Sequence, residues 1–310
     1  MYDLIIIGGG PGGVAAGVYA ARKKMKTLLI TDTFGGQSVV SADVQNWIGT
    51  KSISGFDLAK SLEEHLRAQN GIEINENDLV ENIEKKEGGF TVKTKKGKIF
   101  ETKYILLTSG SRRKKLGIPG EKEFDGKGVV YCSICDAPLF DGKKVAVVGG
   151  GNSALEAVLD CLPYASKIYL MVRSDKLKGD PVTQDKVKAH PNVEVMFNAA
   201  PQEIVGKELV TGIKYRKKAA SDKERGTTEE LPLDGVFVEI GLVPNSEFVK
   251  SLVKLDDYGH VMIDHKTQAT SCDGIWAAGD VTDALYKQNN ISVGDAVKAV
   301  LNIYDRVKMG

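Results

Sequence analysis

The feature that most constrains the fold of this 310-residue sequence is a glycine cluster that comes directly after a short apolar run. Residues 4–7 are apolar and predict a β-strand, and the glycines that follow have the spacing G-x-G-x-x-G: Gly8, Gly10 and Gly13. Residues 14–24 are rich in alanine and predict a helix that packs closely on a sheet. A strand, a glycine turn and a helix in this order are typical of a nucleotide-binding unit.

An acidic residue completes this first unit. Residues 27–30 predict a second strand, and Asp32 follows it, 24 residues after Gly8. A dinucleotide-binding βαβ unit carries its ribose-binding acid at about this distance from the first glycine. The alternative is a glycine-rich turn that binds nothing, but it gives no reason for the order of strand, glycines, helix, strand and acid.

The same layout returns in the second half of the sequence. Residues 144–148 and 167–172 predict strands on either side of a helix over 153–162. A second glycine fingerprint lies between the first of these strands and the helix, and consists of Gly149, Gly151, Asn152, Ser153 and Ala154. The sequence therefore contains two nucleotide-binding fingerprints with a similar plan.

Both halves also close in the same way. Each contains a hairpin-like region, over 90–102 in the first half and over 193–233 in the second. Each then ends in an apolar strand before a glycine, Gly110 or Gly241. The repetition predicts an α/β fold made of two Rossmann-like, three-layer nucleotide-binding domains. The segment from about residue 245 onward is too short for a core of its own and must pack on one of them.

Composition and charge exclude several other classes of protein. Apolar residues make up 42% and charged residues 27% of the chain, and the net charge of +1 provides no general attraction to nucleic acid or to a membrane surface. The basic run 112–115 is interpreted as a solvated linker in preference to a binding patch. The first apolar run is too short for a signal peptide, and no stretch approaches the roughly 18 apolar residues of a membrane span. We therefore expect a cytoplasmic protein.

A pair of cysteines lies between the two fingerprints. Cys132 and Cys135 form a C-x-x-C motif that can close a small, easily reduced disulfide, and Asp136 is the titratable group next to it. A dithiol between two nucleotide sites indicates a path for electrons. Half of a zinc site is the alternative, but zinc needs about four ligands and the remaining cysteines, Cys161 and Cys272, stand alone. These two are interpreted as ordinary core or loop residues, and no metal site is expected.

Taken in order, these motifs resemble a known family over essentially the whole chain. The sequence resembles the low-molecular-weight thioredoxin reductases and, nearly as closely, the reductase portion of the alkyl hydroperoxide reductase flavoprotein subunit. The matching stretches are the two fingerprints, Gly35–Gln37, Cys132–Asp136, Gly241–Asn245, Gly279–Val281 and Lys287–Gln288. The second relative carries additional N-terminal thioredoxin-like domains, which we expect to be a separate protein here.

The resemblance implies a domain order and two nucleotide sites. Residues 1–112 and 245–310 would bind FAD, and residues 113–244 would be an inserted domain that binds a nicotinamide dinucleotide and carries the dithiol. The implied FAD residues are Gly8, Gly10, Gly13, Asp32, Gly36, Gln37, Asn46, Gly110, Gly279, Asp280, Val281, Lys287 and Gln288. The implied nicotinamide residues are Gly149, Gly151, Asn152, Ser153, Ala154, Arg173, Lys178 and Gly241.

The resemblance also implies roles for the dithiol and a partner. Cys135 would face the flavin, Cys132 would attack the disulfide of a partner protein, and Asp136 would be the acid that manages protons. The partner would be thioredoxin or a thioredoxin-like redoxin, and the enzyme would be a homodimer. A flavin-bound redox sensor without fast turnover is an alternative from another class, which the intact Cys132, Cys135 and Asp136 disfavour.

The electron donor is where the sequence departs from the family. Members that use NADPH carry His-Arg-Arg and a further arginine for the 2′-phosphate, whereas this chain has Val172, Arg173 and Ser174, followed by Lys178. Arg173 can pair with a phosphate, so NADPH is the preferred donor. A surface role for Arg173, NADH as the donor to a peroxiredoxin-linked redoxin, and reduction by ferredoxin stay open as alternatives.

Overall fold

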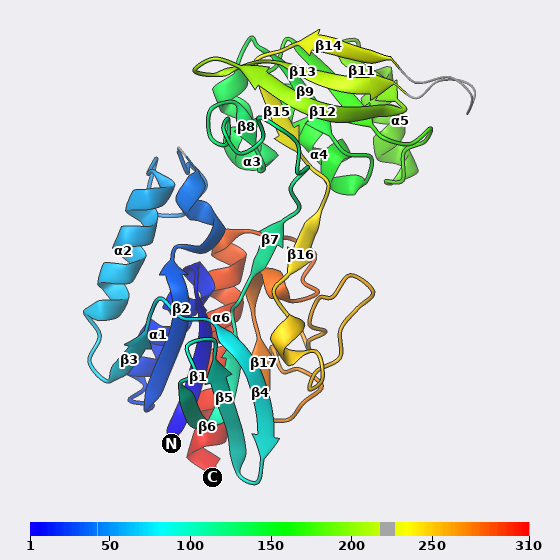
Figure 1. Ribbon diagram of the computed structural model, residues 1–310. Coiled ribbons are helices and arrows are strands. Elements are labelled where there is room, and N and C mark those ends of the chain that lie inside the picture. The colour runs from blue at the N-terminus through cyan, green and yellow to red at the C-terminus, as the bar shows by residue number, and fades with distance from the viewer. Residues whose placement is uncertain (42, 218–226, 310) are drawn as a thin grey trace. The chain divides into compact units, whose positions relative to one another are not determined.

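The computed structural model describes residues 1–41, 43–217 and 227–309 (Figure 1). The chain divides into two compact units, Met1–Arg112 with Val243–Gly310 and, inserted between these segments, Arg113–Leu242. The return to the first unit lies two residues before the expected position at 245. Among the described residues, no helix is long and apolar enough to cross a membrane.

The first unit is built around a mixed sheet with the strand order β3-β2-β1-β6-β5-β4, and β17 pairs with β6 off this path. Its elements are β1 (Tyr2–Gly9), α1 (Pro11–Arg22), β2 (Thr27–Phe34), η1 (Gly36–Val40), α2 (Gly55–Arg67), β3 (Ile72–Asn75), β4 (Val80–Lys86), β5 (Gly89–Thr94), β6 (Ile99–Leu107), η3 (Glu247–Val249), β17 (Ile275–Ala277), η4 (Gly279–Val281) and α6 (Asn289–Met309). Strand β6 is parallel to β1 and antiparallel to β5, so it joins the parallel sheet to the β4–β5 hairpin.

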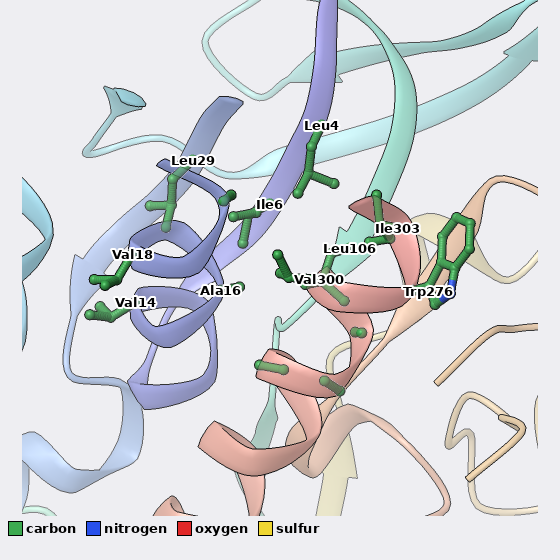
Figure 2. Close-up of a cluster of buried hydrophobic side chains, with 14 of the residues drawn as sticks. Leu4, Ile6, Val14, Ala16, Val18, Leu29, Leu106, Trp276, Val300 and Ile303 are labelled. Atoms are coloured by element: carbon green, nitrogen blue, oxygen red, sulfur yellow. The ribbon is translucent and has the colours of Figure 1, made fainter. Parts of the chain in front are cut away.

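Alternating side chains of β1 fill the cores on the two faces of this sheet. Leu4 and Ile6 pack with side chains of α1 and α6, as Figure 2 shows. Ile5 and Ile7 pack on the opposite face with the β4–β5 hairpin and the C-terminal segment around Val249–Val281. All four are almost fully buried, and each contributes roughly 1.5–3 kcal/mol by leaving water. The strand is therefore a central layer between two others, as its unbroken apolar run indicates.

Local signals set the ends of the helices. Pro11 occupies the first turn of α1, where its missing N–H costs no hydrogen bond. The Ser54 side chain caps α2 by accepting from the Asp57 amide, and basic residues occupy the last turn of that helix. Asp180 caps α5 (Pro181–Ala189) in the same way by accepting from the Thr183 amide. Each of these signals is local to its helix, although α1 begins three residues before its predicted start at 14.

The second unit repeats the plan with a parallel sheet of order β11-β10-β9-β15-β8 and an antiparallel sheet of order β12-β13-β14. Its elements are β8 (Val129–Val130), α3 (Ser133–Asp136), η2 (Ala137–Phe140), β9 (Lys144–Val148), α4 (Asn152–Cys161), β10 (Lys167–Val172), α5 (Pro181–Ala189), β11 (Val193–Phe197), β12 (Ala199–Gly206), β13 (Val210–Lys217), β14 (Thr228–Pro232) and β15 (Gly235–Val238). Val145 and Val147 of β9 face the helices, while Ala146 and Val148 face the antiparallel sheet. The predicted fold class, two Rossmann-like three-layer domains, is confirmed.

The expected hairpin over 193–233 is wrong at its beginning. Strand β11 pairs in parallel with β10, with Ile168 opposite Val193, and the antiparallel pairing starts only at β12. Val193, Val195 and Phe197 pack against the helix-side core, which draws this strand into the parallel sheet. Residues 218–226 of the expected hairpin lie outside the described residues.

The run 112–115 crosses from the first unit to the second, and Arg112, Lys114 and Lys115 are exposed, which agrees with its interpretation as a solvated linker. Strands β7 (Ser111–Arg113) and β16 (Leu242–Pro244) pair with each other. The Arg112 guanidinium donates to Asn245 Oδ1 at 2.8 Å and to Glu247 Oε1 at 2.6 Å. Lys115 Nζ lies 2.8 Å from Asp125 Oδ2. Arg112 and Lys115 therefore have partners that a local reading of the sequence does not reveal.

Candidate active site

A pocket of about 770 Å³ lies in the first unit where strands β1, β2 and β6 end. This volume is in the range of binding sites for small molecules and cofactors. Several residues predicted for FAD line it: Gly8, Gly10, Asp32, Gly36, Gln37, Gly110, Gly279 and Asp280. The pocket therefore gathers residues from turns that are up to 272 positions apart in the chain, between Gly8 and Asp280.

Three glycines allow the close backbone packing at and behind this pocket. Gly8 has φ +119°, and a Cβ there would overlap the carbonyl of Thr108 at the end of β6. A Cβ at Gly13 would overlap the carbonyl oxygen of Gly8, so only glycine lets α1 start this close to β1. A Cβ at Gly279 would lie 2.9 Å from the Ser292 hydroxyl of α6. This close backbone packing fits a pyrophosphate at the start of a helix, which is what the fingerprint predicts.

Other residues predicted for FAD do not line the pocket. Gly13 has the packing role given above, and Val281 is fully buried in the core. Asn46 donates to Gln288 Oε1 at 3.3 Å. Lys287 donates to the Thr282 carbonyl at 2.5 Å, and burial lowers its pKa against the opposing effect of Asp280. These residues therefore pack or form hydrogen bonds within the first unit and do not face the pocket.

The sequence missed one element of the pocket. Asn245 and Glu247 line it next to Ser109, Gly110 and Arg112. The Asn245 amide donates to the Ser109 carbonyl at 2.9 Å, and the Ser109 hydroxyl donates to the Asn245 carbonyl at 2.7 Å. The two crossing segments are held together by these bonds. The sequence analysis included Asn245 only as the last residue of the family motif 241–245, without a role in the pocket.

The dithiol lies in the second unit at the start of a single helical turn. Cys132 and Cys135 form a disulfide with a Cα–Cα distance of 5.4 Å. Cys132 precedes α3 as its N-cap, and both cysteines are partly exposed. Ile134 between them is 56% exposed. By contrast Cys161 and Cys272 are free and buried, as expected. The pair that can exchange with another disulfide is the one that solvent reaches.

Asp136 is a buried carboxyl group next to this pair, only 7% exposed. Burial raises its pKa to about 6, while Arg113 and the Cys132 amide, which donates to the carboxylate, act in the opposite direction. A carboxyl group that titrates near neutral pH can both take up and release a proton under physiological conditions. The predicted acid therefore has an environment suited to that role.

Two further carboxylates near the dithiol were not found from the sequence. The Ser133 hydroxyl donates to Asp160 Oδ2 at 2.7 Å, and the Ser133 amide donates to the Glu239 carboxylate. Burial raises the pKa of Glu239 to about 7, although Arg113 lowers it. Asp160 belongs to α4 and Glu239 follows β15, so nothing local links them to the cysteines. In the described part of the chain, no group of three or more His, Cys, Asp or Glu could hold a metal ion.

The second fingerprint repeats the packing of the first. Gly149 has φ +152°, and a Cβ there would overlap the Glu239 carbonyl oxygen. Gly151 is the N-cap of α4, and Ala154 is fully buried in that helix. The Asn152 side chain accepts from the Asp180 amide at 2.7 Å. Among the predicted nicotinamide residues, Asn152 therefore holds the loop before α5, and Ser153 is exposed at the start of α4.

The remaining predicted nicotinamide residues lie at the ends of β10 and β15. Arg173 and Lys178 are exposed, and within the described residues neither side chain has a hydrogen bond or ion pair to the protein. The Lys178 amide donates to the Gly150 carbonyl at 2.7 Å, which brings this loop to the fingerprint. Gly241 has φ +100°, and its carbonyl accepts from the Lys114 amide at 3.0 Å. Two exposed cations thus flank the second glycine turn.

The fold and these sites agree with comparisons to known proteins. Residues 2–300 match the family described as pyridine nucleotide-disulphide oxidoreductase. The structure of thioredoxin reductase from Streptococcus pyogenes MGAS5005 is similar, with a TM-score of 0.91 and 31% identity over 100% of this chain and 99% of that one. Thioredoxin reductase from Giardia duodenalis has a TM-score of 0.90 and 30% identity over 99% of both chains.

Curated relatives are somewhat closer in sequence but longer. NADH dehydrogenase from Bacillus subtilis (strain 168) is 40% identical over 304 residues, which are 98% of this chain and 58% of that protein. A subunit of alkyl hydroperoxide reductase in Staphylococcus epidermidis (strain ATCC 12228 / FDA PCI 1200) is 39% identical over 306 residues, 99% of this chain and 59% of that protein. This chain therefore spans slightly less than three fifths of these curated relatives.

These matches define the class of protein first and the family second. The fold is that of the flavoproteins with two dinucleotide-binding domains, and the family match together with the partly exposed cysteine pair defines an oxidoreductase. The chain belongs to the pyridine nucleotide-disulphide oxidoreductase family. The resemblance to thioredoxin reductases and to the alkyl hydroperoxide reductase relative is confirmed.

Proposed function

We propose that this protein reduces the disulfide of thioredoxin or of a thioredoxin-like redoxin with electrons from NADPH. The observation that carries this proposal is the partly exposed disulfide Cys132–Cys135 beside the buried Asp136, in the unit that also holds the second glycine fingerprint. Solvent reaches the cysteines, so a protein disulfide can approach them. The likeness to thioredoxin reductases over whole chains supports the same reaction.

The pocket of the first unit fits FAD. The glycine turn after β1 leaves room for a pyrophosphate, and Asp32 lines the pocket where a ribose would lie. We propose that Gly8, Gly10, Gly36, Gly110, Gly279 and Asp280 hold the cofactor together with Gln37. Bound there, FAD would accept a hydride from the nicotinamide nucleotide and pass the two electrons on to the disulfide. Gln37 is already oriented by its own bond, since Nε2 donates to the Ser111 carbonyl at 2.6 Å.

The exchange with the partner follows from the chemistry of the two cysteines. In the reduced protein, the Cys132 thiolate attacks one sulfur of the partner disulfide and releases the other as a thiolate. The Cys135 thiolate then attacks the Cys132 sulfur, which releases the partner dithiol and restores the Cys132–Cys135 disulfide. Asp136, whose pKa burial raises to about 6, gives the proton that a leaving thiolate needs. It holds the reacting turn by accepting from the Cys132 amide.

NADPH is proposed as the donor because of the charges after β10. Arg173 and Lys178 are exposed and have no protein partner among the described residues, so both are available to a 2′-phosphate. NADH is the second candidate, since a similar protein from Bacillus subtilis is named NADH dehydrogenase. In that case the acceptor would be a redoxin linked to a peroxiredoxin, as the similarity to a subunit of alkyl hydroperoxide reductase supports.

A homodimer in the cytoplasm is proposed as the working form. The dimer rests on the resemblance to the family. The location rests on chemistry, because Cys161 and Cys272 are free thiols and a reducing compartment keeps such thiols reduced.

Spectroscopy and a coupled assay test the function. The purified protein should be yellow with about one FAD per chain, as the dinucleotide fingerprint at the pocket of the first unit predicts. With oxidised thioredoxin it should consume NADPH faster than NADH, and Cys132→Ser and Cys135→Ser should abolish disulfide reduction while flavin stays bound. A colourless protein that takes up no FAD, or a Cys132→Ser variant with full activity, would overturn the proposal.

A further inference from the structure

The residue that links the dithiol to the second glycine fingerprint is Glu239. Its backbone packs on the fingerprint, since a Cβ at Gly149 would overlap the Glu239 carbonyl oxygen and the Glu239 amide donates to the Val148 carbonyl at 2.9 Å. Parallel pairing of β15 with β8 puts Phe237 opposite Val130, so the two chains lead side by side to Glu239 and Cys132, and the Glu239 carboxyl group accepts from the amide of Ser133, the residue directly after Cys132. One residue therefore contacts both functional turns of the second unit.

The carboxyl group of Glu239 is surrounded by charged groups from several elements. Asp136 of α3 and Asp160 of α4 raise its pKa, and Arg113 of β7 lowers it. The Cys161 thiol of α4 is also near, since Glu239 contributes to raising its pKa. Burial is the largest effect and brings the pKa of Glu239 to about 7. Glu239 therefore changes its charge within the physiological range, directly beside the turn that carries Cys132.

We propose that Glu239 is a positioning residue for the dithiol, which holds the Cys132 turn through the Ser133 amide and opposes thiolate formation at Cys132 when it is ionised. This rests on the proposed function only in that the dithiol must exchange with another disulfide. When Glu239 is neutral, its repulsion of a thiolate is lost and the bond to the Ser133 amide weakens, because that bond is no longer charge-assisted. The ionisation of Glu239 therefore tunes how readily the reduced protein attacks a disulfide.

The chain offers matched variants that separate this role from a structural one. Glu239→Gln keeps an acceptor for the Ser133 amide and removes the charge. Ser133→Ala keeps the amide but removes the hydroxyl that donates to Asp160. Glu156→Gln removes an exposed carboxylate from the surface of α4. Only the first of these changes removes a titrating group that touches the Cys132 turn.

Alkylation of the reduced protein by iodoacetamide measures the thiolate directly. The reaction forms a thioether at sulfur and releases iodide, and peptide mass spectrometry assigns it to Cys132. In the wild type, we expect the rate against pH to show an inflection near 7 in addition to the ionisation of the thiol. Glu239→Gln should lose this inflection and react about threefold faster at pH 7.5, which corresponds to a thiol pKa about half a unit lower.

The outcomes distinguish the proposal from its alternatives. Ser133→Ala and Glu156→Gln should keep the inflection near 7. A Glu239→Gln profile that superimposes on the wild type, or loss of the inflection in Ser133→Ala as well, would overturn the proposal. If Glu239→Gln did not fold, a wild-type profile with no inflection near 7 would overturn it equally. The assay needs neither nucleotide nor partner protein, so it is independent of whether the proposed function holds.

Discussion

The two units have the same backbone plan but use equivalent positions for different chemistry. In each, a residue after the closing strand packs on the first glycine of the fingerprint: Thr108 on Gly8, and Glu239 on Gly149. The Thr108 hydroxyl contacts the carbonyl oxygens of Ile7 and Gly8, at the glycine turn of the same unit. The Glu239 carboxylate instead contacts Ser133 beside the dithiol. The shared backbone plan thus places these two residues at equivalent positions but does not determine which groups their side chains contact.

A second pair of equivalent positions differs in the sign of its charge. Strand register aligns Ile7 with Ile30 in the first unit and Val148 with Met171 in the second. Two residues further along each strand come Asp32 in the first unit and Arg173 in the second. An acid at this place suits ribose hydroxyls, and a guanidinium suits a phosphate. The difference predicts that the two glycine fingerprints prefer different nucleotides.

The largest effect is expected where the two fingerprints pack differently. A Cβ at Gly13 would overlap the Gly8 carbonyl, whereas the second unit accommodates the Cβ of the buried Ala154. Gly13→Ala should therefore destabilise the first unit by about 3 kcal/mol or more. Ala154→Gly should cost the second unit only about 1 kcal/mol. Urea unfolding followed by fluorescence of the buried Trp276 measures the first variant, and hydrogen exchange in β9 measures the second.

Equal costs for the two substitutions would show that the close approach of α1 to β1 does not distinguish the units. The same variants report on ligand binding, because Gly13→Ala also moves the start of α1 at the pocket.

The pH dependence of stability is expected to be nearly as large and confined to the second unit. Burial raises the pKa of Asp136 to about 6 and that of Glu239 to about 7, from 3.8 and 4.5. Between pH 4.5 and 7 the folded unit then binds more protons than the unfolded chain, so its stability falls as the pH rises. We expect global opening of β9 and β15 to cost about 3 kcal/mol less at pH 8 than at pH 5.

Hydrogen exchange read by mass spectrometry, corrected for intrinsic rates, resolves this for each unit. Glu239→Gln should flatten the dependence in the second unit by about half, and the first unit should show no comparable loss. Stability of the second unit that rises from pH 5 to pH 8 would contradict the burial of these two carboxyl groups.

The difference between Asp32 and Arg173 predicts an effect on nucleotide preference. If Arg173 pairs with a 2′-phosphate, Arg173→Ala should raise the KM for NADPH about ten- to a hundredfold and hardly change the KM for NADH. This corresponds to roughly 1.5–3 kcal/mol for a charge-assisted contact. Steady-state kinetics with both nucleotides measure it, and Lys122→Ala, an exposed cation elsewhere in the unit, is the control. Equal changes for both nucleotides would leave Arg173 as a surface residue.

The smallest effect is expected at Thr108. Thr108→Val removes the hydroxyl bonds to Ile7 and Gly8, at 3.0 and 3.2 Å, but the Thr108 amide still donates to the Ile7 carbonyl. The loss should be about 1 kcal/mol in urea unfolding, without a change in its pH dependence. If the effect of Thr108→Val on the free energy of unfolding varied with pH, Thr108 and Glu239 would not differ in the way described.

Much of the fold follows from the sequence because its signals are local. The apolar runs, glycine spacings and helix caps lie within a few residues of the elements they define, as with Ser54 at the start of α2. The repeated order of these signals predicted both three-layer units, and the C-x-x-C spacing predicted the disulfide. The prediction of where antiparallel pairing begins was wrong at β11, because the parallel pairing of this strand with β10 depends on packing against α4 and α5.

The surroundings of the dithiol were decided only by the tertiary structure. Asp160 and Glu239 follow Ser133 by 27 and 106 positions, and no local pattern relates them. Glu239 reaches the dithiol because β15 pairs in parallel with β8, with Phe237 opposite Val130, and Asp160 reaches it from the last turn of α4, which packs against α3. There, burial of Asp136 and Glu239 raises both pKa values into the physiological range. The sequence specified which groups are present, and the sheet determined which of them share a dry environment.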